Sequence, residues 1–372
     1  MGTLVAEGAW VAGAVGVGAV GIGAVGGVMP ERGFAVYRRL LGFRVHPVAE
    51  IEVILPNLNS RFSGVTAATV AVVPHQQAGV GLAQVGYPLA LDIPRLSWWQ
   101  LFKLTAKPLP SGRPRIFHTR RNIEMVAGLL LKHVFRRRLH LLFTSVAQRH
   151  HTWFTRFLYH RMDTVISPSP RSASFLRCPV KAIVPHGVDT VNYFPAEDRA
   201  KAWAEGGVSG KYGIGIFGRV RPQKGLQEFV DALCEVLPRH PDFTAIIVGE
   251  TTPKFAAFVN RLKEKIRECG LESRFCWLGK LPFKDIPLWF RRVSLVAAVS
   301  HNEGFGLTCL EAMASGTPVI GTRTGAFDMV IRDGTDGLLV PCKDTAALAA
   351  AFERLLADPA NLEVMGRAAR QR

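Results

Sequence analysis

Two carboxylates, Glu303 and Glu311, have seven residues between them and lie on either side of the start of a predicted helix. The loop between them contains Gly304 and Gly306, and glycine permits close approaches that a side chain would block. The free N–H groups and positive dipole end of a helix N-terminus bind anions. A ligand with both a phosphate and hydroxyl groups would use the N–H groups and the carboxylates together. The alternative is an ordinary amphipathic helix with a solvated Glu311.

Two cations, Arg219 and Lys224, form a second candidate group. They flank a Pro/Gly turn between a predicted strand that ends at Gly218 and a predicted helix at 226–237. Because ligands bind at the carboxyl ends of parallel strands, cations in this turn would neutralise a diphosphate. Residues 213–218 spell G-x-G-x-x-G, but there the intervening residues are the strand itself, whereas the dinucleotide fingerprint needs its glycines in the following turn. The alternative is two exposed basic residues.

Strands and helices alternate along the chain in two successive blocks, which predicts an α/β protein with two Rossmann-like, doubly wound domains. The first block opens with a strand at 51–55, a glycine-containing loop and a helix at 65–73. Its segment 86–114 carries five prolines and the pair Trp98-Trp99 and is expected to be irregular, and a helix is expected at 123–139. The second block restarts the pattern at the strand 213–218. The predicted divisions are an N-terminal extension at 1–50, a basic N-terminal domain at 51–195, a polar linker at 196–210 and a C-terminal domain at 211–372.

His118 is a candidate site residue because it ends the predicted strand 115–118, where the side chains of such a domain meet ligands. The alternative is a histidine that makes only local hydrogen bonds. His150 and His151 are not predicted to bind a metal, because neither a carboxylate nor a third histidine lies at ligand spacing. The six cysteines form no CxxC pair, which predicts free thiols in a reducing compartment.

The net charge of +17 is concentrated in the first half of the chain. Residues 1–195 hold 22 Lys and Arg against 8 Asp and Glu, whereas residues 196–372 hold 24 against 21. Such a basic half attracts polyanions, namely nucleic acid, anionic lipid head groups or anionic glycolipids. The basic, partly apolar stretches 32–44 and 123–139 favour a membrane surface, and no basic-plus-aromatic motif points to nucleic acid. The alternative is a solvated basic surface.

The uncharged segment 10–29 contains three near-copies of a glycine-rich pentapeptide. It nearly has the length of a membrane span, but about a third of it is glycine, which disfavours a helix. The segment is therefore read as a poor membrane anchor, a disordered tail or an artefactual extension, and we favour the last two. The final helix is expected to be truncated at Arg372.

Three motifs give the chain a resemblance to the retaining GT-B glycosyltransferases of family 4, the glycosyl transferases group 1. They are Gly218-Arg219 with Lys224-Gly225, the segment from Glu303 through Glu311 to Val319, and Pro185-His-Gly-Val-Asp189. Segments 119–125, 143–151 and 161–163 resemble, within that family, the lipopolysaccharide core mannosyltransferases of alpha-proteobacteria. Departures from the family pattern are Cys309, where proline is common, and the absence of a glutamate from Gly325-Ala-Phe-Asp-Met329.

The resemblance implies a role for each candidate. Glu311 would hold the ribose hydroxyls of the nucleotide, Glu303 the hydroxyls of the donor sugar, and His118 would face the transferred sugar. Arg219 and Lys224 would neutralise the diphosphate. The remaining donor contacts would come from the backbone of Gly218, Gly304, Phe305, Gly306, Leu307 and Thr308.

The resemblance also implies an activity, the transfer of mannose from GDP-mannose to a Kdo-bearing lipopolysaccharide core acceptor at the cytoplasmic face of the membrane. Preplaced cations and N–H groups would stabilise the charge on the leaving phosphate. No DxD motif is present, so transfer is predicted to be metal-independent and to need no cofactor. The expected partners are the nucleotide sugar, an anionic glycolipid of the Kdo-lipid A type and the membrane surface, with which the protein would associate peripherally. The sequence does not indicate an oligomeric state. The alternatives are another donor, such as UDP-glucose, and a non-catalytic basic membrane-binding module.

Overall fold

The structure is a computed structural model that describes residues 47–60, 64–77, 79–89 and 91–372. All of these belong to one compact unit, residues 44–372. The glycine-rich segment 10–29 and the basic stretch 32–44 lie outside the described residues, as does nearly all of the predicted extension 1–50. None of the described helices is both long and apolar enough to span a bilayer.

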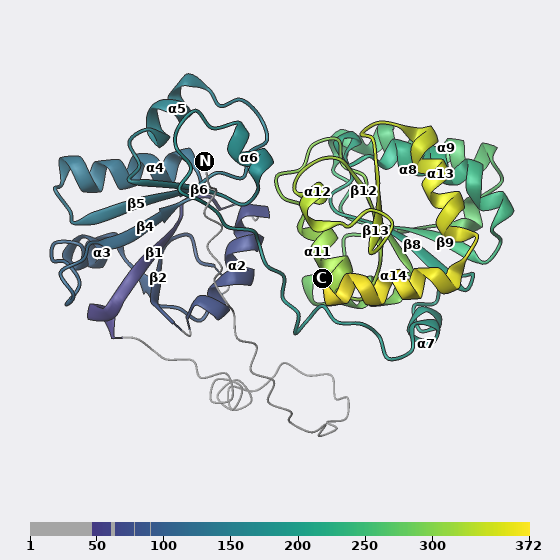
Figure 1. Ribbon diagram of the computed structural model, residues 1–372, viewed down its shortest axis with the longest axis horizontal. Coiled ribbons are helices and arrows are strands. Elements are labelled where there is room, and N and C mark those ends of the chain that lie inside the picture. Colours follow the sequence, from purple (N-terminus) through teal and green to yellow (C-terminus); the bar gives the residue numbers. More distant parts are fainter. Residues whose placement is uncertain (1–46, 61–63, 78, 90) are drawn as a thin grey trace, which may run out of the picture. The chain divides into compact units, whose positions relative to one another are not determined.

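The N-terminal domain is built on a parallel sheet of seven strands in the order β3-β2-β1-β4-β5-β6-β7 (Figure 1). Its strands are β1 (Ile51–Asn57), β2 (Gly81–Gly86), β3 (Arg95–Leu96), β4 (Arg115–Thr119), β5 (Leu139–Thr144), β6 (Thr164–Ser167) and β7 (Ala182–Ile183). Its helices are η1 (Val48–Glu50), α2 (Gly64–Gln76), α3 (Trp98–Leu104), α4 (Asn122–Leu129), η2 (Leu130–Val134), α5 (Trp153–Tyr159) and α6 (Pro170–Ser174).

Helices cover both faces of this sheet. Successive residues of a strand point to opposite faces, so neighbouring side chains pack against different helices. On β1, Leu55 packs with Val73 of α2 in one apolar cluster. Its neighbour Ile54 belongs to the other cluster, with Leu101 of α3 and Met125 of α4. The domain is therefore doubly wound, as the sequence predicted.

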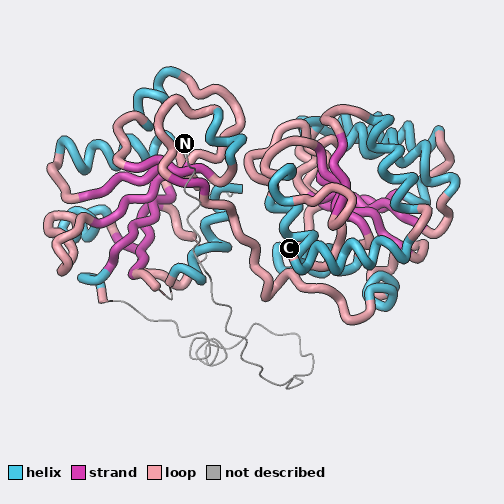
Figure 2. Tube along the Cα trace, in the orientation of Figure 1, coloured by secondary structure: helices cyan, strands magenta, loops and turns pink. Residues whose placement is uncertain are grey.

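The C-terminal domain repeats the design with six parallel strands in the order β10-β9-β8-β11-β12-β13. Its strands are β8 (Tyr212–Phe217), β9 (Phe243–Val248), β10 (Phe275–Gly279), β11 (Leu295–Ala298), β12 (Val319–Thr322) and β13 (Gly337–Val340). Its principal helices are α8 (Leu226–Val236), α9 (Ala256–Glu268), α10 (Ile286–Arg292), α11 (Leu307–Ala314), α12 (Phe327–Val330), α13 (Thr345–Leu356) and α14 (Pro359–Gln371). Figure 2 shows the strands of each domain enclosed by helices. Ile247 and Ile246 of β9 belong to the two different apolar clusters, one on each face.

Three regions differ from the sequence-based expectation. The segment 86–114, expected to be irregular, contains β3 and α3, whose start is fixed by a reciprocal cap between Ser97 and Gln100. The helix expected at 123–139 widens into a π-helical turn, η2, and ends before Arg136, which has a left-handed φ of 51°. The predicted linker 196–210 contains a helix, α7 (Arg199–Ala204).

Candidate active site

The turn after β8 brings Lys224 to the carboxyl edge of the C-terminal sheet. Gly218 follows the strand, and a short 3-10 turn (Pro222–Lys224) leads into α8. Gly225 joins the two with a φ of 74°, and a Cβ atom there would lie 2.0 Å from the carbonyl oxygen of Val299. Only glycine permits this close approach to the chain that leaves β11. The turn is therefore fixed next to the loop that carries Glu303.

Lys224 and Glu303 form an ion pair. The Nζ atom of Lys224 lies 2.5 Å from Oε2 of Glu303, and the hydroxyl of Ser300 donates to the same oxygen at 3.2 Å. Arg219 is exposed and has no hydrogen-bond or ion-pair partner within the described part of the chain. The structure thus brings Lys224 and Glu303 together and leaves the guanidinium of Arg219 unpaired.

The loop 303–306 ends at the N-terminus of α11. Gly306 precedes the helix with a φ of 103°, and a Cβ atom there would lie 2.0 Å from the ring of Phe327. Phe305 is buried, and its carbonyl oxygen accepts the backbone N–H of Ala326 at 2.9 Å. Leu307 and Thr308 are the first helical residues. Their N–H groups have no acceptor within the helix and are available to an anion.

Glu311 lies one turn into α11 and accepts a hydrogen bond at 3.3 Å from the hydroxyl of Tyr193. Burial raises the pKa of Glu311 to about 7, against smaller lowering effects from the Tyr193 hydrogen bond and the charge of Lys224. Tyr193 is itself buried, and burial together with Glu311 raises its pKa, so the phenol remains a donor. Tyr193 was not predicted from the sequence, because no local motif marks it.

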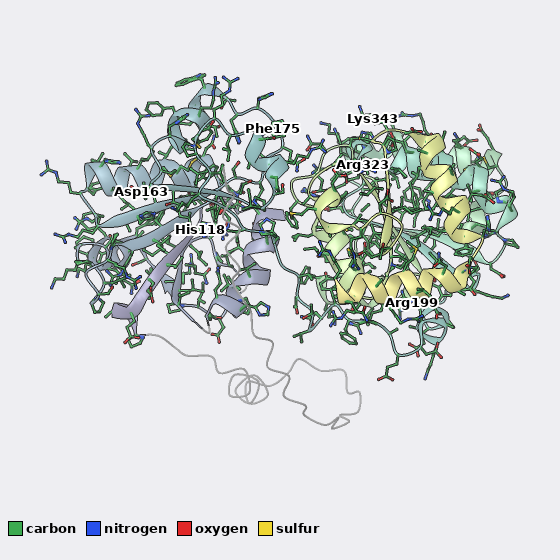
Figure 3. The ribbon with its side chains drawn as sticks, in the orientation of Figure 1. His118, Asp163, Phe175, Arg199, Arg323 and Lys343 are labelled. Carbon is green, nitrogen blue, oxygen red and sulfur yellow. The ribbon has the colours of Figure 1, made fainter. Side chains whose placement is uncertain are left out.

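His118 belongs to the other sheet, at the carboxyl end of β4 (Figure 3). Its Nε2 atom lies 2.7 Å from Oγ1 of Thr144, and its Nδ1 atom lies 3.4 Å from Nη2 of Arg120. Because Arg120 must be the donor, Nδ1 is the acceptor and Nε2 carries the proton. Burial, followed by the charge of Arg120, lowers the pKa of His118 well below its ordinary value, so the ring is neutral. None of its contacts in the described chain is with a predicted donor-site residue.

Residues of the N-terminal domain also contact the loop around Glu303. The amide nitrogen of Gln148 donates to the carbonyl oxygen of Gly304 at 3.1 Å, and its amide oxygen accepts the N–H of Gly325 at 3.1 Å. The ring of His186 packs edge-on against Phe305, with centroids 4.9 Å apart. The sequence singled out neither contact, since each joins residues more than 100 positions apart.

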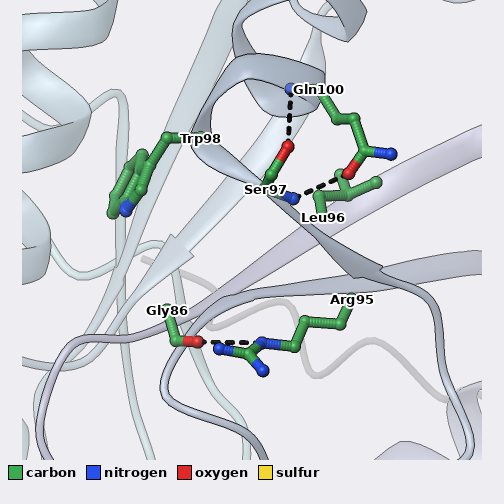
Figure 4. Close-up of a pocket in the computed structure, with 6 residues that line it drawn as sticks. All are labelled: Gly86, Arg95, Leu96, Ser97, Trp98 and Gln100. Carbon is green, nitrogen blue, oxygen red and sulfur yellow. Dashed lines mark hydrogen bonds between the residues drawn. The ribbon is translucent and has the colours of Figure 1, made fainter.

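A pocket of about 390 Å³ lies at the end of β2 and is separate from the predicted site residues (Figure 4). Gly86, Arg95, Leu96, Ser97, Trp98 and Gln100 line it. Arg95 donates to the carbonyl oxygen of Gly86 at 3.2 Å, and Trp98 is exposed. The described residues include no group of three or more His, Cys, Asp or Glu side chains that could hold a metal ion.

Comparisons with known proteins identify the class. Residues 199–372 match the family model of the glycosyl transferases group 1. The chain is 44% identical to the lipopolysaccharide core biosynthesis mannosyltransferase LpcC of Rhizobium leguminosarum bv. viciae, over 84% of this chain and 88% of that one. It is 40% identical to the lipopolysaccharide core biosynthesis mannosyltransferase LpsB of Rhizobium meliloti, over 84% and 92%.

Solved structures agree on the fold. Anabaena HepE in complex with UDP has a TM-score of 0.73 at 21% identity, covering 86% of this chain and 94% of that one. Sucrose-phosphate synthase from Thermosynechococcus elongatus has a TM-score of 0.66, also at 21% identity, over 86% and 93%. The chain belongs to the glycosyl transferases group 1 family and is a glycosyltransferase with the GT-B fold. This family membership confirms the resemblance seen in the sequence. It favours an enzyme over the alternative of a non-catalytic membrane-binding module.

Proposed function

We propose that the protein transfers mannose from GDP-mannose to a Kdo-bearing lipopolysaccharide core acceptor, with retention of the anomeric configuration and without a metal ion. The observation that carries the proposal is the Lys224–Glu303 pair, 2.5 Å apart, beside the N-terminus of α11. It combines a cation and free N–H groups for a diphosphate with a carboxylate for sugar hydroxyls. The names of the two relatives support mannose and the lipopolysaccharide core.

In the proposed mechanism, Lys224 and the exposed Arg219 neutralise the diphosphate, together with the N–H groups of Leu307 and Thr308. Negative charge develops on the leaving phosphate as the sugar–phosphate bond breaks. Donors already in place stabilise that charge without reorganisation, and each such donor contributes roughly 10²–10³ in rate. Binding of the donor replaces the contact between Lys224 and Glu303, so that each side chain is released to one part of the donor.

The rest of the donor site holds the hydroxyl groups. Glu303 accepts from the hydroxyls of the sugar, and Glu311 from those of the ribose, while Gly218 and the backbone of Gly304, Phe305 and Gly306 allow the donor to approach closely. His118, as a neutral ring with its proton on Nε2, faces the transferred sugar. The proton of the acceptor hydroxyl leaves through the departing phosphate, on the same face of the sugar, which retains its configuration.

The function is tested by offering the purified protein GDP-mannose, UDP-glucose and other nucleotide sugars with a Kdo-containing lipid acceptor. We expect nucleotide release and a mannosylated product with GDP-mannose, the α-anomer by NMR, at a rate that EDTA leaves unchanged. A higher kcat/KM with UDP-glucose would establish the alternative donor. The proposal is wrong if the folded protein transfers no sugar from any donor, or if EDTA abolishes transfer and a divalent cation restores it.

We also propose that the N-terminal domain docks on anionic membrane through the outer surfaces of α3, η2 and α5. Exposed aromatic side chains, among them Trp99, Phe135 and Trp153, lie on α3, on α5 and at the residue after η2. Phe102 of α3 contacts Phe135 with ring centroids 5.5 Å apart, and Asn122 of α4 donates to Thr155 of α5 at 2.8 Å, which joins the elements into one surface. Basic residues accompany the aromatic ones on this surface, namely Lys103, Arg136, Arg137, Arg138, Arg156 and Arg161.

Aromatic side chains with interspersed cations are typical of the lipid–water interface. The double variant W153A/F157A is therefore expected to lose binding to vesicles that contain phosphatidylglycerol, measured by co-sedimentation. Because Trp153 and Phe157 are both exposed side chains of α5, nucleotide binding and thermal stability should not change. Phe283, exposed on the C-terminal domain, offers the matched control F283A. Equal vesicle binding by W153A/F157A and F283A would exclude this surface.

A further inference from the structure

The carboxyl edge of the N-terminal sheet holds a cation that lacks a carboxylate partner. Arg120 follows β4 directly, and its side chain is half-buried. Among the described residues its guanidinium has one hydrogen-bond partner, Nδ1 of His118, at a long 3.4 Å. A guanidinium presents five N–H donors in a planar fork, so most of them remain available. Partial burial of an unpaired charge is unfavourable, and an anionic ligand would remove that cost.

Glu124, four residues after Arg120, accepts hydrogen bonds from groups other than the guanidinium of Arg120. Its Oε2 atom accepts the backbone N–H groups of Arg120 at 2.8 Å and Arg121 at 3.1 Å. Its Oε1 atom accepts Nη1 of Arg121 at 2.9 Å, in a carboxylate that is 1% exposed. Arg121 thus balances Glu124, and the two guanidinium groups, although adjacent in sequence, have different tasks.

The other titratable groups beside Arg120 carry no negative charge. The pKa of His118 is lowered well below its ordinary value, and burial, followed by the charge of Arg120, lowers the pKa of His186 to about 4. Burial lowers the pKa of Arg120 itself, but only to about 10. At neutral pH both histidines are therefore neutral, and Arg120 remains a cation.

We infer that Arg120 binds an anionic group, a carboxylate or a phosphate, on the sugar acceptor. The inference rests on the proposed function, in which His118 faces the transferred sugar. Because Arg120 contacts His118, an anion on Arg120 would lie on, or next to, the acceptor residue that receives the sugar. A donor diphosphate has the same chemistry, but Lys224, Arg219 and the N-terminus of α11 already provide its counter-charges in the proposed site.

The test compares two forms of the Kdo-containing lipid acceptor. In one form the Kdo carboxylate is intact, and in the other it is reduced to an alcohol. For the wild type we expect a higher kcat/KM with the anionic acceptor. In R120Q the ratio of the two kcat/KM values should fall by about 10- to 100-fold, as expected for one charged hydrogen-bonding contact. In R120K, which keeps the charge and loses the fork, an intermediate ratio is expected.

The matched control is R113Q, because Arg113 is exposed in the same domain just before the amino end of β4 and its loss changes the net charge equally. Its acceptor ratio should stay within about twofold of the wild type, as expected for an exposed charge. Thermal unfolding and the Kd for GDP show whether R120Q is folded. An unchanged ratio in folded R120Q would overturn the inference, and so would a loss of GDP affinity equal to the loss of transfer, which would place the anion on the donor. Failure of the wild type to transfer to either acceptor would instead refute the proposed function.

Discussion

Charged residues are paired differently at the carboxyl edges of the two sheets. On the C-terminal sheet, Lys224 is paired with Glu303, and Glu311 accepts from Tyr193. On the N-terminal sheet, Glu124 and Arg121 balance each other, and within the described part of the chain the guanidinium of Arg120 has only the neutral His118 as a hydrogen-bond partner. The C-terminal edge thus offers a ligand carboxylates together with cations, whereas on the N-terminal edge the carboxylate of Glu124 is 1% exposed and Arg120 is the charged group that remains for a ligand.

This difference fits two kinds of substrate. A nucleotide sugar has a charged diphosphate between two polyhydroxyl groups, and the C-terminal edge provides both cations and carboxylates. The N-terminal edge provides a cation with neutral histidine and threonine side chains, which suits an anionic acceptor. A substitution at one edge should therefore change the use of one substrate and leave the use of the other unchanged.

The largest effect is expected from K224A. If Lys224 stabilises the leaving diphosphate, its removal should lower kcat by roughly 10²–10³. Lys211 provides a matched control, because its Nζ atom lies 3.1 Å from Asp242 in an exposed ion pair of the same domain. K211A should leave kcat within about twofold, since exposed pairs contribute little. Steady-state kinetics with a fixed acceptor measures both, and equal kcat values for K224A and K211A would contradict the donor role.

The donor edge could be read from the sequence because its residues are close together in the chain. Glu303, the glycines and Glu311 fall within nine positions, and Lys224 follows a recognisable strand. The parallel α/β design was predictable for a similar reason, since each strand and helix has its own local pattern. Helix α3 was missed because prolines and the Trp98-Trp99 pair made its segment look irregular, although Ser97 and Gln100 form a recognisable cap.

The acceptor edge could not be read in this way, because its contacts join distant segments. Arg121 reaches Asn57, 64 positions away, and His118 contacts Thr144, 26 positions away. No pattern distinguishes Arg120 from Arg121, since both follow the same strand. Only the side-chain contacts show that the guanidinium of Arg121 is bound to Glu124 and that the guanidinium of Arg120 is not. The same holds for Tyr193, whose contact with Glu311 spans 118 positions.

A second prediction separates a structural carboxylate from a proposed substrate-binding one. E124Q should lower the free energy of unfolding by about 3–5 kcal/mol, because it removes the buried negative charge that balances the guanidinium of Arg121. E303Q should cost less than about 1 kcal/mol, because its pair with Lys224 is partly exposed, at 23% and 33% of the side chains. Urea unfolding measures both, and turnover should fall in folded E303Q. A larger loss of stability in E303Q than in E124Q would reverse these assignments.

The smallest effect concerns the pH dependence of donor binding. Glu311 has a pKa raised to about 7, and in the proposed site only its carboxylate form accepts from both ribose hydroxyls. The KM for the donor should therefore rise as the pH falls from 8 to 6, and this dependence should be absent in E311Q. Stability should show the opposite dependence. The folded state holds the Glu311 proton to a higher pH than the unfolded chain does, so unfolding free energy falls as pH rises from about 4.5 to 7.

Tyr193 sharpens this prediction because its hydroxyl favours the charged form of Glu311. Y193F removes one neutral hydrogen bond to a carboxylate, worth about 1–2 kcal/mol, and should raise the pKa of Glu311 by about one unit. The pH below which the donor KM rises should move upward accordingly, while the acceptor ratio controlled by Arg120 should not change. Tyr212, a half-buried tyrosine at the start of β8, supplies the control Y212F. Identical donor pH profiles for Y193F and Y212F would show that Tyr193 does not tune Glu311.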